Sequence, residues 1–186
     1  MNEIFKMGLI LCAITLLAGF SLGSVYEITK EPIAEQKQKA QQVAMQAVLK
    51  KAERFEMTDQ AMDETQEVKE IQIGYQGDQI VGYVMKVVTK GYGGEIEMMV
   101  GMDQDGVIEG IKILRHAETP GLGAKAQEQT FCDQYANKSA EQELWVTKST
   151  PTTEQEIEAL TGATITTNAV TEGVNTALKM FEEKIK

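Results

Sequence analysis

The N-terminal part of the chain contains a long run without charged side chains, residues 7–26. At 1.5 Å per residue, a helix of about 20 residues crosses the ~30 Å hydrocarbon core of a membrane. We therefore expect a transmembrane helix here. The alternative is a cleaved signal peptide, with Lys6 in its positively charged first part and Ser21 and Gly23 near a cleavage site. The lysines do not orient the helix, because Lys6 precedes the run and several others, from Lys30 on, follow it.

Length and charge limit what can follow this anchor. The chain has 186 residues, which leaves room for one domain with a sizeable core. Its formal net charge is −10, and it has no cluster of Lys and Arg with interleaved aromatic residues, so we expect no nucleic-acid binding. His116 is the only histidine, and Cys132 is the only cysteine outside the anchor. We therefore expect neither a disulfide within the domain nor a metal site built on histidine or cysteine.

A polar spacer is expected between the anchor and the domain. Residues 27–55 are rich in Gln, Lys, Glu and Ala, with apolar side chains at helical spacing, and predict a helix that starts after Pro32. Residues 57–70 carry many acidic and few large apolar side chains, which indicates a loop or a short helix. The expected division of the chain is an anchor at 1–26, a helical spacer at 27–69 and a domain at 70–186.

The domain begins with segments typical of β-strands. Runs rich in Val, Ile, Met and Tyr occur at 79–89, 96–103 and 107–114, with a shorter one at 70–75. Residues 103–106 predict a hairpin turn. Later segments predict a helix at 124–135, a short strand or buried turn at 144–146, and a C-terminal helix. Strands followed by helices favour an α+β fold with an antiparallel sheet and flanking helices.

The C-terminal helix has a clear apolar stripe and an unusual first turn. The stripe predicts an amphipathic helix from about Thr164 to Lys184 and consists of Ile165, Ala169, Gly173, Ala177, Phe181 and Ile185. Gly162 and Ala163 precede it and carry almost no side chain, so a ligand can approach the backbone, and a helix N-terminus favours a bound phosphate. The alternative is an ordinary helix cap in which the hydroxyl of Thr161 or Thr164 accepts a backbone hydrogen bond.

Two further segments carry turn-forming residues. Residues 116–123 read His-Ala-Glu-Thr-Pro-Gly-Leu-Gly, and the Pro-Gly pair indicates a tight turn that can fold against a flat ligand. Residues 90–94 read Lys-Gly-Tyr-Gly-Gly and connect two predicted strands, so Tyr92 can lie against a ring system. Taken alone, each segment is explained at least as well by a plain connection, with Glu118 and Thr119 as capping groups in the first and a simple hairpin turn in the second.

Together these three segments resemble a known family. Residues 161–166 are similar to the signature [Ser/Thr]-Gly-Ala-Thr-x-Thr of FMN-binding domains, in which a flavin transferase esterifies the last threonine with the FMN phosphate. The acidic residue that usually stands three positions earlier, commonly Asp, is Glu158 here. Residues 116–123 resemble the His-x-Glu-Thr-Pro-Gly-Leu-Gly loop that borders the isoalloxazine in this family, and residues 90–94 resemble its Lys-Gly-Tyr-Gly-Gly segment.

The resemblance implies a set of site residues. It implies Thr166 as the attachment site of covalent FMN, through a phosphoester. The residues that it implies as contacts of the cofactor are Thr161, Gly162, Ala163, Thr164, Tyr92, Gly93, His116, Glu118, Thr119, Gly121 and Leu122. No catalytic residue and no metal ligand is implied, because the chemistry belongs to the flavin.

The order of anchor, helical spacer and one such domain resembles the G subunits of Rnf-type electron transport complexes. The C subunits of sodium-translocating NADH:quinone reductases share the domain but tend to be longer, and are the second choice. The resemblance implies an electron carrier within an ion-translocating ferredoxin/NAD oxidoreductase complex. Its implied partners are other membrane and iron–sulfur subunits and a flavin transferase for maturation, and the FMN domain is implied to lie on the extracytoplasmic side of the cell membrane.

Two other functions are open at this point. One is a membrane-tethered flavoenzyme that binds FMN without a covalent bond, for which His116 and Glu118 are the candidate proton donors. The other is a binding module in which the glycine-rich turns hold no cofactor. The visible spectrum of the purified protein separates the binding module from the two flavoproteins, and retention of colour after denaturation separates covalent from non-covalent FMN.

Overall fold

The structure is a computed structural model that describes residues 3–58 and 67–185. Contacts between Cα atoms divide the chain into two units, Met1–Gln41 and Gln42–Lys186. The second unit includes residues that the sequence analysis assigned to the spacer, because the end of the first helix and a first strand belong to it.

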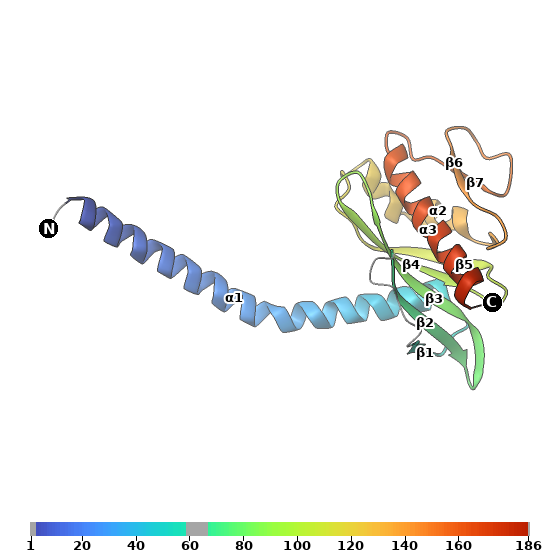
Figure 1. Cartoon of the computed structure of the whole chain (residues 1–186), viewed down its shortest axis with the longest axis horizontal. Helices are drawn as coiled ribbons and strands as arrows, with labels where there is room; N and C mark the ends of the chain where they lie inside the picture. Colours follow the sequence, from blue (N-terminus) through green and yellow to red (C-terminus); the bar gives the residue numbers. More distant parts are fainter. Residues whose placement is uncertain (1–2, 59–66, 186) are drawn as a thin grey trace. The chain divides into compact units, whose positions relative to one another are not determined.

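The first unit is part of one helix, α1, which spans Glu3–Val48 (Figure 1). In the part of the chain that the structure describes, α1 is the one helix long and apolar enough to cross a membrane. Hydroxyl groups within this stretch bond to its own backbone, as when the Thr15 hydroxyl donates to the carbonyl oxygen of Leu11 at 3.0 Å. Such internal bonds leave few polar groups unpaired in a hydrocarbon environment.

The expected helix start after Pro32 is wrong, because α1 continues through this residue. Proline lacks the N–H group that an interior helical position donates, so one backbone bond is lost there. Strongly helix-forming sequence lies on both sides of Pro32, and the helix ends at Val48, earlier than the predicted residue 55.

The second unit is built on a five-stranded antiparallel sheet in the order β1-β2-β3-β4-β5 (Figure 1). The strands are β1 (Arg54–Met57), β2 (Val68–Gln76), β3 (Gln79–Lys90), β4 (Glu95–Met102) and β5 (Ile108–Arg115). The four predicted strands are therefore confirmed, and β1 is an addition that pairs with β2. The predicted hairpin turn between β4 and β5 is also confirmed, with the Asp103 carboxylate accepting the backbone N–H groups of Asp105 and Val107 at 2.9 Å each.

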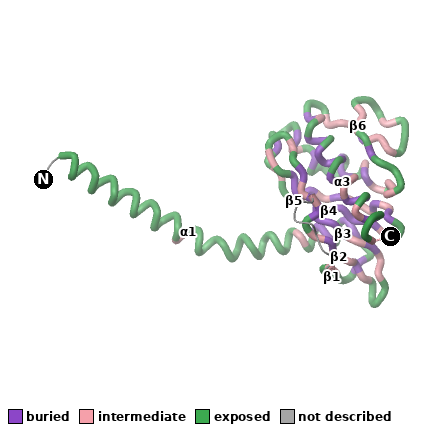
Figure 2. The backbone as a smooth tube through the Cα atoms, in the orientation of Figure 1, coloured by how far each residue is buried: buried purple, intermediate pink, exposed green. Residues whose placement is uncertain are grey.

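Both faces of the sheet are covered within this unit. Helix α3 (Thr164–Lys184) packs on β3 and β4, and their shared core includes Met85, Val87, Met98, Val170, Val174 and Phe181. The end of α1 covers the other face, where Met45, Val48 and Leu49 pack with Val84 and Met99. In Figure 2 the buried positions accordingly concentrate in the sheet and α3. The expected α+β fold with an antiparallel sheet and flanking helices is confirmed.

Helix α3 has the predicted bounds, and its stripe of small residues lets it lie close to the sheet. At Gly173, an added Cβ atom would come within 2.6 Å of the Thr89 methyl group and 2.7 Å of the Met98 methyl group. Ile165 is an exception to the stripe, because it is 56% exposed. The close approach at Gly173 brings α3 next to β3 and β4.

The remaining segments are shorter than expected. The predicted helix at 124–135 is divided into a 3₁₀ turn η1 (Gly123–Gln127), one turn of α-helix α2 (Gln129–Cys132) and a second 3₁₀ turn η2 (Asp133–Tyr135). The division occurs because Glu128 takes an extended conformation, with φ −66° and ψ 139°. Strand β6 (Trp145–Thr147) lies close to the short strand or buried turn expected at 144–146. It pairs in parallel with β7 (Glu156–Glu158), a strand that was not predicted.

Candidate functional site

The segment before α3 forms a tight turn in which Gly162 has φ +76°, a value that favours glycine. The cap residue of α3 is Ala163, and it makes no side-chain hydrogen bond to the first helical turn. The alternative of an ordinary threonine cap is therefore wrong. The turn is closed instead by Thr167, whose hydroxyl accepts from the N–H of Leu160 at 3.1 Å and donates to the Ala163 carbonyl at 3.1 Å.

The loop after β5 folds back on itself. The Nδ1 atom of His116 accepts a hydrogen bond from the N–H of Glu118 at 3.1 Å. Farther along, the Thr119 carbonyl accepts the N–H of Leu122 at 3.2 Å, and Gly121 takes φ +77° inside this turn. As a result, the carboxylate of Glu118 is buried, while Thr119, Gly121 and Leu122 lie at the surface.

The hairpin loop between β3 and β4 lies against the loop after β5. Gly91 donates its N–H to the Gly94 carbonyl at 2.8 Å and closes the loop. At Gly93, an added Cβ atom would meet the backbone carbonyl of Ala117. The glycine is needed for this close approach, and it brings the backbone of one motif directly to that of the other. Tyr92 projects from the loop and is 71% exposed.

All three segments meet at the carboxylate of Glu118. Its Oε1 atom accepts the N–H of Gly93 at 2.8 Å, and its Oε2 atom accepts the hydroxyl of Thr166 at 2.5 Å. Glu118 is 6% exposed and Thr166 is 1% exposed. A Cβ atom added at Gly123 would lie 2.6 Å from both Glu118 Oε2 and Thr166 Oγ1. The buried pair is thus packed on one side by a backbone that has no room for a side chain.

The predicted site residues divide into a hydrogen-bonded centre, in which Glu118 and Thr166 are buried and Gly93 is exposed, and an exposed rim. Gly93, Glu118 and Thr166 are joined by hydrogen bonds, and His116 supports the backbone of Glu118. Residues of the rim are Tyr92, Thr119, Gly121, Leu122, Thr161 and Gly162, all of them exposed. Ala163 is buried and Thr164 is half-buried. The Cδ2 atom of Leu122 lies 3.1 Å from the Cβ position of Gly162, so the rim is continuous across the two loops.

Sequence reasoning missed two contributors to this centre. Gly123 was expected only as part of the loop at 116–123, and Thr167 was not among the expected site residues. The sequence offered one signal for Gly123, since two glycines spaced around Leu122 are more than a single turn needs. For Thr167 it offered none, because a hydroxyl that closes a turn looks the same in sequence as one that faces solvent.

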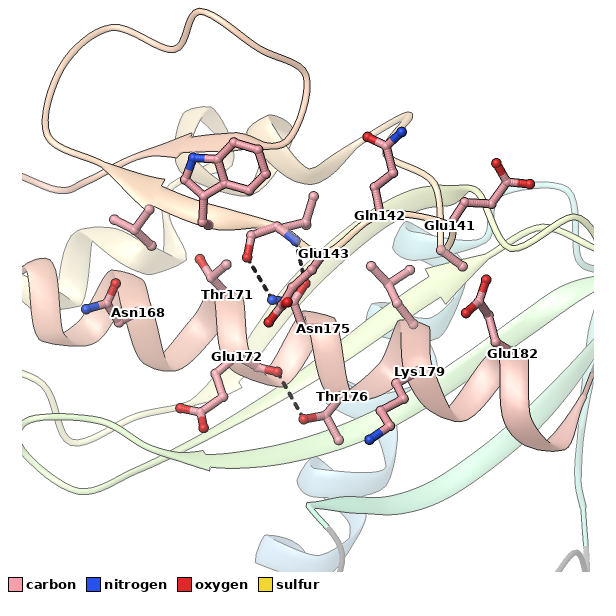
Figure 3. A pocket seen from close by; sticks show the side chains of 15 residues that line it. Glu141, Gln142, Glu143, Asn168, Thr171, Glu172, Asn175, Thr176, Lys179 and Glu182 are labelled. Atoms are coloured by element: carbon pink, nitrogen blue, oxygen red, sulfur yellow. Dashed lines mark hydrogen bonds between the residues drawn. The ribbon is translucent and has the colours of Figure 1, made fainter.

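A separate open groove of about 730 Å³ runs along the outer side of α3 (Figure 3). Its lining includes four glutamates, Glu141, Glu143, Glu172 and Glu182, one cation, Lys179, and the half-exposed Trp145. Asn175 holds its wall in place, because its amide group accepts the Leu144 N–H at 2.9 Å and donates to the Leu144 carbonyl at 2.8 Å. No residue of the three motifs lines this groove.

Two other buried polar side chains of the domain, Cys132 and Tyr135, have hydrogen-bond partners. Burial raises the pKa of the Cys132 thiol, which donates to the Ala126 carbonyl at 3.4 Å. Burial also raises the pKa of Tyr135, whose hydroxyl lies 2.9 Å from that of Thr171. Among residues 3–58 and 67–185, no three side chains of His, Cys, Asp or Glu are grouped so that they could hold a metal ion. The Glu118–Thr166 pair is therefore the centre that merits a functional assignment.

Comparison with known proteins bears on the family and the fold of this chain. The family model described as FMN-binding domain matches residues 91–179, which include the motifs at 116–123 and 161–166 and the first motif from Gly91 on, and the model of the RnfG N-terminal region matches residues 1–48. Two solved structures share the fold. The C subunit of the Na⁺-translocating NADH-quinone reductase of Parabacteroides distasonis has a TM-score of 0.60 and 15% identity. The superposed region covers 82% of this chain and 95% of that subunit. The Shewanella oneidensis NqrC has a TM-score of 0.52 and 18% identity, and the superposed region covers 61% of this chain and 57% of NqrC.

The fold and the motif-bearing loops thus define a protein of the FMN-binding domain class. The G subunit of the Na⁺-translocating ferredoxin:NAD⁺ oxidoreductase complex of Acetobacterium woodii is 40% identical to this chain. The alignment covers 98% of this chain and 94% of that subunit. The G subunit of the proton-translocating complex of Clostridium ljungdahlii is 36% identical, and the alignment covers 96% of this chain and 91% of that subunit. This chain belongs to the family of G subunits of Rnf-type ion-translocating oxidoreductase complexes, and the prediction of that family is confirmed.

Proposed function

We propose that this protein is a membrane-anchored electron carrier that holds FMN through a phosphoester on Thr166. FMN, when bound, accepts and passes electrons, and the protein supplies its anchoring and surroundings. The observation that carries the proposal is the position of the Thr166 hydroxyl. It lies where the three motif-bearing segments meet and donates a hydrogen bond to Glu118. Membership of a family whose model is an FMN-binding domain supports the same assignment.

The neighbouring hydroxyls are poorer acceptors for the phosphoester. Thr167 is as buried as Thr166, but its hydroxyl is already used on both sides by Leu160 and Ala163. Loss of these bonds would open the turn before α3. Thr161 is exposed and Thr164 is half-buried, and among the described residues the Glu118 carboxylate bonds to Gly93 and Thr166 rather than to either of them. These arguments support Thr166, the position that the family resemblance also indicates.

The surroundings of Thr166 fit a flavin phosphate, provided that the negative charge of the Glu118 carboxylate is neutralised or turned away. The first turn of α3 offers backbone N–H groups that the side chain of Ala163 does not cap, and the N-terminal end of a helix attracts negative charge. The exposed rim, with Leu122, Gly121 and Tyr92, gives a flat ring a surface to lie on. The Glu118 carboxylate, however, would face a phosphate at close range. A negatively charged neighbour at this distance must be neutralised or must turn away.

The place of this carrier in a complex follows from its relatives. Two of them are named as G subunits of ferredoxin:NAD⁺ oxidoreductase complexes that translocate Na⁺ or protons. We propose that this chain likewise passes electrons within such a complex, beside other membrane and iron–sulfur subunits, and that a flavin transferase loads it. The domain then lies on the extracytoplasmic side, with α1 as an uncut anchor. A covalent link prevents loss of FMN on that side.

Attachment is tested by coexpression of the full chain with a flavin transferase. We expect the wild type to fluoresce on a denaturing gel and its Thr166-containing tryptic peptide to carry the mass of FMN. Thr166→Ala should fold and show neither signal. Thr153→Ala is the control, because it removes an exposed threonine hydroxyl outside the three motifs, and it should keep both signals. An adduct that persists in Thr166→Ala would assign the ester to another residue, and colour that is lost on denaturation of the wild type would favour non-covalent FMN.

The membrane arrangement is tested on intact cells. Protease added outside should remove the domain and leave a fragment that contains the start of α1. A mature N-terminus near Ser24 would indicate a cleaved signal peptide. A domain that is protected in intact cells and digested after lysis would place it in the cytoplasm.

A further inference from the structure

We propose that Glu118 is the proton acceptor for the Thr166 hydroxyl when the flavin phosphoester forms. This inference rests on the proposed function of Thr166 and goes beyond it, because it assigns part of the attachment chemistry to the acceptor protein rather than to the transferase alone. The observation behind it is the hydrogen bond of 2.5 Å from Thr166 Oγ1 to Glu118 Oε2.

The direction of this bond is the one that a proton transfer needs. A threonine hydroxyl is a weak nucleophile until a base takes its proton, and the base must lie within hydrogen-bond reach of that proton. In the structure the hydroxyl donates and the carboxylate accepts. Ion pairs of lysine or arginine with Glu118 do not occur among the described residues, so no salt bridge competes for the carboxylate.

The carboxylate is also held in place. The N–H of Gly93 donates to Glu118 Oε1 at 2.8 Å. The imidazole of His116 accepts the backbone N–H of Glu118 at 3.1 Å. The missing side chain of Gly123 leaves room for both reacting oxygen atoms. A base that is positioned in this way loses little conformational freedom when it acts.

The proposed step balances in atoms and charge. Its second substrate is a flavin nucleotide in which the FMN phosphate is activated as a phosphoanhydride. Thr166 Oγ1 forms a bond to the FMN phosphorus, and the anhydride P–O bond breaks, so the second nucleotide leaves with the electron pair of that bond. The hydroxyl proton moves to Glu118 Oε2. No atom is oxidised or reduced.

Proton transfer also neutralises the Glu118 carboxylate, which a phosphate on Thr166 requires. Once Glu118 has taken the proton, it is a neutral carboxylic acid beside the new phosphate, and its O–H group can donate to a phosphate oxygen. The same proton movement thus activates the hydroxyl and removes the negative charge that would repel the product.

The test measures the rate of adduct formation on the full chain with excess transferase and flavin donor, followed as covalent fluorescence on denaturing gels. Glu118→Gln keeps the size of the side chain and an oxygen atom for the Gly93 N–H, but it cannot accept a proton. We expect its rate to fall by about 100-fold or more, the usual contribution of a general base. Glu128→Gln, an exposed glutamate on the next segment, is the matched control and should load at the wild-type rate.

A second variant separates proton transfer from packing. Glu118→Ala leaves a small cavity beside Thr166, and added formate should raise its loading rate at least about tenfold, whereas formate should leave Glu118→Gln slow. A Glu118→Gln variant that loads within about threefold of the wild type would overturn the proposal. A slow Glu118→Ala variant that formate does not rescue would overturn it equally. Failure of the wild type to load is a different result, since it refutes the proposed function itself.

Discussion

Thr167 closes the turn before α3 by bonding to two backbone groups at once, the Leu160 N–H and the Ala163 carbonyl, each at 3.1 Å. Thr167→Val keeps the shape of the side chain and removes both bonds. We expect a loss of about 1–3 kcal/mol in the free energy of unfolding, because the partly buried N–H group of Leu160 is left unpaired. Urea denaturation of the domain measures this loss. Thr164→Val, on the same turn, should change stability by less than about 0.5 kcal/mol. Equal losses in the two variants would contradict the assigned role.

Asn175 gives a second stability prediction. In Asn175→Leu the side chain keeps its volume but can no longer bond to the N–H and carbonyl of Leu144. We expect a loss of about 2–3 kcal/mol, together with a shift in the fluorescence of the neighbouring Trp145, because the groove wall is released from α3. Asn168→Leu is the control, since Asn168 is exposed on the same side of the helix. A Trp145 spectrum that stays unchanged in Asn175→Leu would show that other contacts hold the wall.

Gly123→Ala tests the packing around the acceptor hydroxyl. The new methyl group would lie 2.6 Å from both Glu118 Oε2 and Thr166 Oγ1, so one of them must move. We expect a loss of about 1–3 kcal/mol in stability and slower flavin attachment. Gly110→Ala is a suitable comparison, because the nearest atom to its added Cβ is 3.7 Å away. Normal stability and normal attachment in Gly123→Ala would mean that the pair has more space than the structure indicates.

Lys86 is a buried cation on the sheet that bridges two carboxylates, Glu70 at 3.1 Å and Glu97 at 3.0 Å. Lys86→Met should destabilise the domain by roughly 3 kcal/mol, because Glu97 is buried and would keep only Arg115, at 3.5 Å, as a partner. Lys51→Met removes an ion pair with Glu109 whose lysine is exposed, and should have no measurable effect. Similar denaturation midpoints for Lys86→Met and the wild type would refute this prediction.

The Lys86 pair also has an expected pH dependence. Burial lowers the pKa of Lys86, but hydrogen bonds to Glu97 and Glu70 raise it, and the net shift is upward from 10.5. A raised pKa in the folded state stabilises the protein below the ordinary lysine value, and this contribution is lost as the pH rises through the folded value. The stability difference between the wild type and Lys86→Met should therefore be constant at neutral pH and shrink above about pH 10.5. Denaturation series at several alkaline pH values measure it.

The parts of the fold that the sequence predicted well are those with a repeated pattern. Helix α3 has an apolar stripe along its whole length, and β3, β4 and β5 are long runs of strand-forming residues, so their bounds differ by little from the prediction. Strands β1 and β7 are too short for alternation to be visible. The helix predicted at 124–135 is interrupted at Glu128 by an extended backbone conformation, and helix propensity alone carries no sign of this break.

The site was predicted as three separate segments, and the structure adds how they meet. Each segment has local signals, such as the Pro-Gly pair in the loop after β5 or the small residues before α3. The hydrogen bond from Thr166 to Glu118 joins positions 48 residues apart, and no local pattern specifies such a contact. The same holds for Gly93, whose N–H reaches the Glu118 carboxylate across 25 residues of sequence.

The long separation between Thr166 and Glu118 has a consequence for the order of maturation. The two side chains come together only after the sheet has formed and α3 has docked on it, so a nascent or misfolded chain lacks the acceptor pair even though it contains the complete threonine signature. Loading with flavin would therefore select folded subunits. A peptide that contains the signature alone should be a much poorer substrate than the intact domain, and the bound flavin would mark each copy that has passed this selection.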